Sequence, residues 1–392
     1  MNKLGIGLIG CGNRLRGVVK QVLKKTNDVE VVALYDTSEG AIEKSKEAFN
    51  PNAKVYQNYH ALVKDPNVQW VMIGSWNCFH AEHAIAAFEA GKHVFCEKPL
   101  ALNIDDCLAM RKAGEKSNRL FTIGFTLRYS PHYQRIKDLI SSGAIGKIIS
   151  MEFNETLDFN HGGYIHADWR RKTEWAGSHL LEKCCHDIDL VNWMVESTAI
   201  KAASFGGCDF FKPENEFHIQ RVGKNESGVD SFQTWQKKRE GSMGIPGNII
   251  NPFNDDKDIL DNQVAIIQFA NQVRTTFHTN CMSGLPERRM YICGTEGTLR
   301  SDVISGEIQI KRIGFNTQIE NKSTTSNGGH GGGDEILAES IVQSMLNKMA
   351  PKSNLEDGLR AAITVFGIDQ AQNTCQVTDL TPLWEKANIA IR

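Results

Sequence analysis

Long apolar runs are absent from this sequence. The longest, such as Val31–Leu34 and Trp70–Gly74, have the length of a strand, whereas a membrane-spanning helix needs about 20 consecutive apolar residues. The chain passes from Met1-Asn2-Lys3 directly into a strand pattern and shows no apolar region of the signal-peptide kind. We therefore expect a cytoplasmic protein with no membrane partner.

Motifs for metal binding and nucleophilic catalysis are also scarce. The ten cysteines contain no CxxC pair, and Cys184 and Cys185 are adjacent, which is a poor spacing for chelation. His80 and His83 have no acidic partner that would complete a zinc site. No GxSxG or HExxH motif occurs. We expect no metal, and reduced thiols are the default in a cytosolic protein.

An excess of charge of one sign is missing too. The net charge is only -2, from 44 basic and 46 acidic residues, and no basic stripe is visible. This balance argues against nucleic acid as the main partner. The length of 392 residues suits two domains, and a hydrophobic content of 41% can supply a core to both.

Strand-like and helix-like segments alternate in the first third of the chain. From Leu4 to about Gly124, short apolar runs alternate with amphipathic segments such as Val18–Lys25. This repeat predicts a parallel, doubly wound sheet. From Gly146 the runs are longer and polar residues alternate with apolar ones, which predicts a mostly antiparallel second sheet. The expected class is α/β, with a nucleotide-binding domain at 1–125 and a second α/β domain at 126–392.

Two stretches read as long loops, Lys212–Asp258 and Thr317–Asp334. Loops of this length are usually functional lids or mobile insertions. The first contains Phe232, Trp235 and Phe253, which could stack on a sugar or reach a neighbouring subunit, and no spacing rule decides between these roles.

A nucleotide site is indicated at the first strand. Gly10 and Gly12 follow an apolar strand and precede a helix pattern, as a dinucleotide-binding turn requires. The usual third glycine is replaced by Leu15, which weakens the motif, while Asn13 and Arg14 add donors suited to phosphate at a helix N-terminus.

The second strand ends at Asp36, 24 residues after Gly12. An acidic side chain here can accept hydrogen bonds from the adenosine ribose, and it would repel a 2'-phosphate. The pattern therefore favours NAD over NADP as cofactor. The alternative is that Asp36 only caps the next helix.

The tripeptide Glu97-Lys98-Pro99 closes the apolar run His93–Cys96. Ligands of open α/β sheets bind beyond the carboxyl ends of the strands, so Lys98 is a candidate catalytic group. The alternative is an exposed lysine in an ordinary strand-to-helix loop. Asn77 and His80, at the start of an earlier helix, are candidate contacts of the nicotinamide edge.

A second group of ionisable residues lies in the segment Gly177–Trp193. Glu182, His186 and Asp189 have the spacing i, i+4 and i+7, which places all three on one face of a helix. They indicate a base or proton shuttle; the alternative is a buried structural histidine held by carboxylates. Upstream, Trp169 and Arg170 offer an aromatic face and a cation for a polyhydroxylated ligand, although such a cluster is also ordinary at a domain interface.

Taken together, these motifs resemble the glucose-fructose oxidoreductase, inositol dehydrogenase and MocA family from Gly5 to about Leu380. The motifs are GIGLIGCG, AGKHVFCEKPLA, GFTLRYSP, the Glu182 to Asp189 segment and CGTEGTL. The resemblance implies an N-terminal Rossmann domain and a C-terminal α/β domain with a large open sheet, which often forms the interface of a homo-oligomer, a dimer or tetramer. It also implies NAD(P)-dependent oxidation of a sugar or polyol carbon.

Residue by residue, the family's catalytic lysine falls on Lys98, and its Asp-x-x-x-His pair falls on Glu182 and His186, with Glu in place of Asp. Arg128 and Tyr129 fall where the family places residues near nicotinamide and substrate, and Arg170 matches a Trp-Arg element.

The expected mechanism follows from these residues. His186 removes the hydroxyl proton, Lys98 polarises the oxygen or relays the proton, and Glu97 helps to hold the turn beside the cofactor. Two other functions stay open, namely an NAD-retaining glycosidase that oxidises a ring carbon transiently and a non-catalytic regulator that senses NAD or sugar.

Overall fold

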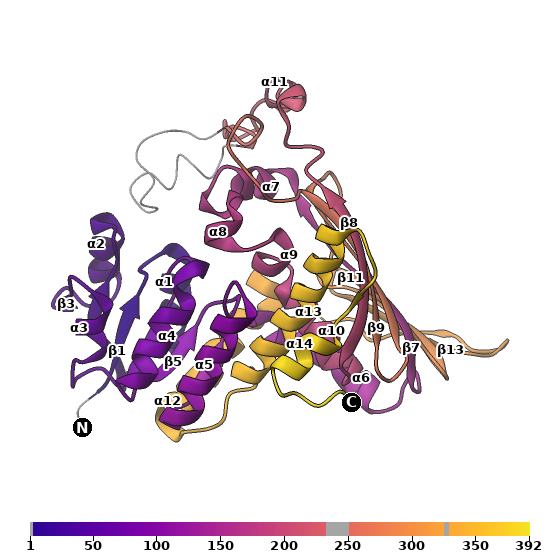
Figure 1. Ribbon diagram of the computed structural model, residues 1–392. Helices are drawn as coiled ribbons and strands as arrows, with labels where there is room; N and C mark the ends of the chain where they lie inside the picture. The colour runs from indigo at the N-terminus through magenta and orange to yellow at the C-terminus, as the bar shows by residue number, and fades with distance from the viewer. Residues whose placement is uncertain (1–2, 233–250, 325–328) are drawn as a thin grey trace. The chain divides into compact units, whose positions relative to one another are not determined.

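The computed structural model describes residues 3–232, 251–324 and 329–392 (Figure 1). Within these ranges the chain forms two units, one of residues 3–128 and 333–362, and one of residues 129–232, 251–324, 329–332 and 363–392. The chain first leaves unit 1 after residue 128, close to the boundary at 125 that the sequence predicts. The return of residues 333–362 to unit 1 is not visible in the sequence pattern.

Unit 1 is built on a six-stranded sheet with the order β3-β2-β1-β4-β5-β6. All five strand pairs are parallel, which confirms the predicted doubly wound sheet. The central strands are apolar throughout because helices of a doubly wound sheet cover both faces. The strands are β1 (Leu4–Ile9), β2 (Val29–Tyr35), β3 (Lys54–Val55), β4 (Trp70–Ile73), β5 (His93–Cys96) and β6 (Phe121–Ile123).

Three helices of unit 1, α2, α3 and α5, begin at side chains that cap their free N–H groups. Ser38, Asn58 and Asn103 each accept a hydrogen bond from the backbone N–H three residues later. Helix α12 packs against α1 although more than 300 residues separate them. The helices are α1 (Asn13–Lys25), α2 (Glu39–Ala48), α3 (Tyr59–Val63), η1 (Asn77–Phe79), α4 (His80–Glu89), α5 (Ile104–Ser117), η2 (Thr126–Tyr129, ending in unit 2), α12 (Gly333–Asn347) and the start of α13 (Leu355–Thr374).

Unit 2 contains a nine-stranded sheet with the order β14-β13-β12-β11-β7-β10-β9-β8-β15. Only β7 and β10 pair in parallel, so the predicted, mostly antiparallel sheet is confirmed. The strands are β7 (Ile148–Asp158), β8 (Ala199–Gly207), β9 (Asn262–Phe269), β10 (Arg274–Ser283), β11 (Arg289–Gly294), β12 (Gly297–Asp302), β13 (Glu307–Arg312), β14 (Ile319–Asn321) and β15 (Thr378–Asp379).

The two faces of this sheet differ. Helices α7 and α10 pack on β7 and β10, whereas Phe205 (64% exposed) and Ile266 (58% exposed) remain on an open face. The helices of unit 2 are α6 (Pro131–Ser141), α7 (Phe159–His166), η3 (Trp169–Arg171), α8 (Thr173–Ala176), α9 (His179–Glu182), α10 (Cys185–Val195), η4 (Pro213–Asn215), α11 (His218–Val222), η5 (Gly329–Gly332), the rest of α13 and α14 (Thr381–Lys386).

The predicted long loop Lys212–Asp258 contributes to the core of unit 2. Phe232 and Phe253 are 2% and 0% exposed and pack with Phe211. Phe232 and Phe253 are therefore unavailable for stacking on a sugar, which is one of the two roles that the sequence leaves open. Trp235 lies outside the described residues. None of the described helices combines the length and hydropathy that crossing a membrane requires.

Candidate functional site

Four strands of unit 1 end at the same level. Because the strands are parallel, the loops that follow them begin at one edge of the sheet. Gly10, Asp36 and Glu97 are the first residues of three of these loops. The paired positions at the strand ends are Ile9 with Tyr35, Ile9 with Ile73, and Ile73 with Cys96.

The turn between β1 and α1 has the shape that a pyrophosphate requires. Gly10 has a φ of 82°, and a Cβ atom there would lie 2.3 Å from the backbone N of Ser75. A Cβ on Gly12 would meet no atom within 4 Å, so this side of the turn is open. The first turn of α1 has neither an acidic residue nor a side-chain cap. Its N–H groups therefore suit a bound phosphate.

Arg14, a predicted phosphate contact, is held by three side chains of unit 1. Its Nε donates to Glu97 Oε1 at 2.9 Å, its Nη1 to Asp334 Oδ1 at 2.6 Å, and its Nη2 to Thr126 Oγ1 at 2.7 Å. The Asn13 side chain accepts a hydrogen bond from Arg16. Contact of Asn13 or Arg14 with phosphate stays a prediction.

Asp36 is fixed by two backbone groups. Its Oδ2 accepts from the N–H of Cys11 at 2.5 Å, and its Oδ1 accepts from the N–H of Ser38 at 2.7 Å. The carboxylate thus joins the phosphate turn to the start of α2. Each oxygen keeps a second lone pair that a ribose hydroxyl can use.

The turn that carries Lys98 is held on both sides. Lys98 is partly exposed, whereas Glu97 is only 6% exposed and bonds Arg14. His80 is fully buried, and its Nδ1 donates to the carbonyl of Pro99 at 2.7 Å. Burial lowers the pKa of His80. Contact of His80 or the buried Asn77 with nicotinamide stays a prediction.

Glu182, His186 and Asp189 do not share one helix, contrary to the sequence prediction. Helix α9 ends at Glu182, and α10 begins at Cys185 after a turn at Lys183 and Cys184. All three side chains are nevertheless buried, at 5%, 4% and 1% exposure. The ring of His186 lies 5.9 Å from that of His330.

Arg170 is the ion-pair partner of Glu182. Its Nε donates to Glu182 Oε1 at 2.9 Å and its Nη1 to the hydroxyl of Tyr164 at 2.7 Å. The guanidinium lies over the Trp169 ring at 4.4 Å. The structure thus brings together Arg170, Trp169 and Glu182, which the sequence names from separate motifs.

Arg128 and Tyr129 are both buried. Arg128 is 7% exposed, and its Nη2 lies 3.0 Å from Asp357 Oδ1 in the first turn of α13. Tyr129 is 0% exposed. Their contact with substrate stays a prediction.

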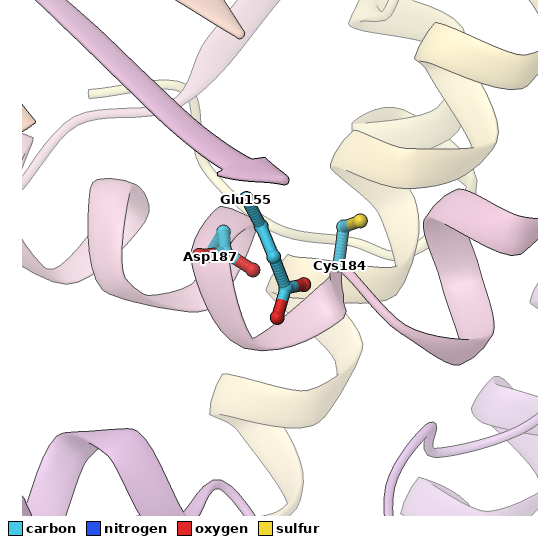
Figure 2. A group of neighbouring side chains, drawn as sticks. All are labelled: Glu155, Cys184 and Asp187. Carbon is cyan, nitrogen blue, oxygen red and sulfur yellow. The ribbon is translucent and has the colours of Figure 1, made fainter. Parts of the chain in front are cut away.

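A charged cluster that the sequence analysis misses lies in unit 2. Among the described residues, Glu155, Cys184 and Asp187 are the group whose potential metal-ligand atoms approach within 4.8 Å (Figure 2). Arg288 compensates this group, with Nη1 at 2.8 Å from Glu155 and both Nε and Nη2 on Asp187. Lys183 lies 3.5 Å from Glu155.

Two cations face the two buried acids of this cluster. Burial raises the pKa of Glu155, but Arg288 and Lys183 outweigh burial and lower it to about 2. For Asp187 burial outweighs Arg288 and raises the pKa to about 7. We interpret the cluster as an ion-pair network of the core. One sequence signal could have revealed a buried acid. Alternate residues of a strand point to the same face, so Glu155 shares the buried face of β7 with Met151 and Phe153.

Two parts of the chain match known family descriptions. Residues 4–125 match the NAD-binding Rossmann fold of an oxidoreductase family, and residues 137–378 match the C-terminal alpha/beta domain of the same family. The chain belongs to the glucose-fructose oxidoreductase, inositol dehydrogenase and MocA family. The Rossmann unit is therefore an NAD-binding domain, and the glycine turn and Asp36 described above fit that cofactor.

Several relatives are named as inositol dehydrogenases. The chain is 31% identical to an inositol 2-dehydrogenase/D-chiro-inositol 3-dehydrogenase of Lactiplantibacillus plantarum, over 59% of this chain and 60% of the relative. It is 32% identical to an inositol 2-dehydrogenase of Gluconacetobacter diazotrophicus, over 51% and 56%. The match thus spans less than two thirds of each relative.

The same fold occurs over nearly the whole chain in a levoglucosan dehydrogenase solved with NADH and levoglucosan. That structure has a TM-score of 0.76 and 20% identity, and the match covers 97% of this chain and 100% of the other.

Proposed function

We propose that this protein is an NAD-dependent oxidoreductase that moves a hydride between nicotinamide and a hydroxyl-bearing carbon of a polyol or sugar. The observation that carries the proposal is the common edge of unit 1, where the phosphate turn, Asp36 and the Lys98 turn begin. Bound NAD supplies the hydride acceptor. The family membership supports the same chemistry.

We assign the protein's own groups as follows. The Lys98 amine donates a hydrogen bond to the substrate hydroxyl oxygen, which favours the charge that develops as its proton leaves. His186 is the base that accepts this proton. Arg170 holds Glu182 at 2.9 Å, so Glu182 serves as a fixed anion near the start of α10.

We propose a neutral cyclic polyol or sugar as the substrate class. Inositol dehydrogenases among the relatives and the levoglucosan dehydrogenase fold match support this choice. The three cations near Glu182 already have acidic partners: Arg170 pairs with Glu182, and Lys183 and Arg288 pair with Glu155. Among these residues, no surplus cation is left for an acidic ligand.

The test is an absorbance screen at the NADH band with NAD or NADP and a panel of inositols, anhydrosugars, glycosides and sugar acids. We expect steady NADH formation with one or a few neutral members and NAD. Release of a free sugar without net NADH would identify the glycosidase alternative. Binding of NAD without turnover of any panel member would identify the regulator.

We further propose that the protein forms a homo-oligomer through the open face of the unit 2 sheet. Phe205, Val264 and Ile266 are 64%, 48% and 58% exposed there, beside a hollow of about 300 Å³. Contiguous apolar surface on a sheet marks an interaction site. In light scattering, Ile266→Glu should lower the mass of the particle, whereas Ile304→Glu, which changes another exposed isoleucine in a turn, should not. An unchanged mass in Ile266→Glu would overturn this proposal.

We place the protein in the cytoplasm. All ten cysteines lie among the described residues and are free thiols, as a reducing compartment allows. Cell fractionation followed by blotting tests this placement, and recovery in a secreted or membrane fraction would contradict it.

A further inference from the structure

We propose that Arg14 and Asp334 are positioning residues for Lys98, acting through Glu97. The inference rests on the proposed function, because it concerns the turn that presents the candidate catalytic lysine. It gives a role in the reaction to a carboxylate of α12, more than 200 residues away in sequence from the Glu97-Lys98-Pro99 turn.

The contacts form a continuous line within unit 1. Asp334, at the start of α12, accepts from Arg14 Nη1 at 2.6 Å, and Arg14 Nε donates to Glu97 at 2.9 Å. The third guanidinium nitrogen is held by Thr126 at 2.7 Å. A planar guanidinium bound at all three nitrogens has one orientation, so its position fixes that of the Glu97 carboxylate.

The surroundings of Glu97 leave its side chain little alternative. Its backbone N–H donates to the carbonyl of Ile73 at 2.9 Å, which continues the pairing of β5 with β4. A Cβ on Gly124 would come within 2.9 Å of Glu97 Oε2, so the carboxylate lies against that backbone. Only 6% of Glu97 is exposed. Its packed carboxylate therefore has little room to shift without disturbing the turn that contains Lys98.

Lys98 lies between two such anchors. Glu97 is tied to Arg14 on the N-terminal side, and the carbonyl of Pro99 accepts from His80 at 2.7 Å on the C-terminal side. Lys98 itself is only partly buried, and the two anchors fix the backbone from which its side chain extends. Small displacements matter here, because misplacement of a reacting group by about 1 Å can cost about 100-fold in rate.

The charges show why Asp334 is needed. One guanidinium faces two carboxylates, and the side chain of Glu97 is 8% exposed while that of Asp334 is 22% exposed. Without Asp334, Nη1 of Arg14 loses its 2.6 Å partner, and only Glu97 and Thr126 then hold the guanidinium. The single bond from Nε to Glu97 is then less fixed in direction, although Arg14 keeps its charge.

The test compares Asp334→Asn with Glu335→Gln in the full chain. Glu335 is the neighbouring exposed carboxylate in the first turn of α12, so its variant controls for the helix dipole. We expect Asp334→Asn to lower kcat by about 10- to 100-fold, with smaller changes in the NAD dissociation constant and the KM. Asp334→Glu, which keeps the charge, should retain more of the wild-type kcat.

A second readout does not depend on turnover. The rate at which an acylating reagent modifies Lys98, measured by mass spectrometry against the exposed Lys116 as internal standard, reports the environment of the amine. We expect this rate to change in Asp334→Asn and to stay at the wild-type value in Glu335→Gln. If Asp334→Asn does not fold, Thr126→Val removes another arm of the Arg14 network and should change the rate in the same way.

The outcomes separate the two proposals. If the wild type turns over no substrate but Asp334→Asn still alters Lys98 acylation, the positioning inference stands and the proposed activity fails. If the wild type is active and Asp334→Asn has wild-type kcat and wild-type Lys98 acylation, the inference is overturned. A lowered unfolding midpoint with both readouts unchanged also overturns it, because the network is then only structural.

Discussion

Arg288→Met should destabilise unit 2 strongly. Arg288 is the main cation between Glu155 and Asp187, which are 3% and 1% exposed. Removing one partner of a buried ion pair leaves uncompensated buried charge and typically costs about 3–5 kcal/mol. For a unit of this size, each kcal/mol lowers the melting temperature by about 2–4 °C. We therefore expect a loss of roughly 6–20 °C by circular dichroism near neutral pH.

The neighbouring residue provides the matched control. Arg289 has a half-exposed side chain and pairs with Glu287 and Glu152 at the surface. Exposed ion pairs contribute about 0–1 kcal/mol, so Arg289→Met should shift the melting temperature by only a few degrees. Comparable stability of the two variants would refute the interpretation of a buried network.

The loss in Arg288→Met should also depend on pH. Without the guanidinium, the pKa of Glu155 rises and that of Asp187, which burial already raises, rises further, because their charged forms are then desolvated without a partner. Protonation at acid pH removes the buried charge, so the difference from wild type should shrink as the pH falls. The triple variant Arg288→Met, Glu155→Gln, Asp187→Asn should recover much of the stability. A wild-type melting temperature that falls on addition of a chelator would instead indicate a metal in this cluster.

Two further predictions concern single carboxylates. Burial raises the pKa of Asp369 to about 7, above its ordinary value of 3.8, so this group favours folding at acid pH and loses that contribution as the pH rises through 7. Asp369→Asn can still accept a hydrogen bond from Ser178. This variant should abolish the loss of stability with rising pH and raise the melting temperature at alkaline pH. An unchanged pH dependence of the melting temperature would contradict the raised pKa of Asp369. Asp36→Asn removes the anion that we predict to bind the ribose. It should weaken NAD binding by about 10-fold and improve NADP binding, as measured by calorimetry; equal affinities in variant and wild type would refute its role.

Elements with a strong repeat could be predicted from the sequence. The alternation of apolar runs and amphipathic segments from Leu4 to about Gly124 predicts the parallel sheet that β1 to β6 form. Strand β8 (Ala199–Gly207) has small residues at many positions, so its alternation is weak and the sequence does not reveal it. The break between α9 and α10 is hidden for another reason. The helical spacing of Glu182 and His186 continues through Lys183 and Cys184, although the backbone does not.

The place of candidate site residues in the fold could be predicted where they follow the end of a strand. Gly10, Asp36 and Lys98 are visible because each follows an apolar run, and parallel strands end at one edge. The partners of Arg14 were not predictable, because Asp334 reaches it through the return of α12 to unit 1. Local patterns carry no information on such contacts between distant segments.

The central claim is tested most directly by Lys98→Ala, assayed for NAD binding by calorimetry and for NADH formation with the best substrate of the panel. The account predicts an NAD dissociation constant close to that of the wild type and a loss of several kcal/mol of transition-state stabilisation, about 10³-fold or more in kcat/KM. Near-normal turnover in Lys98→Ala would contradict the account.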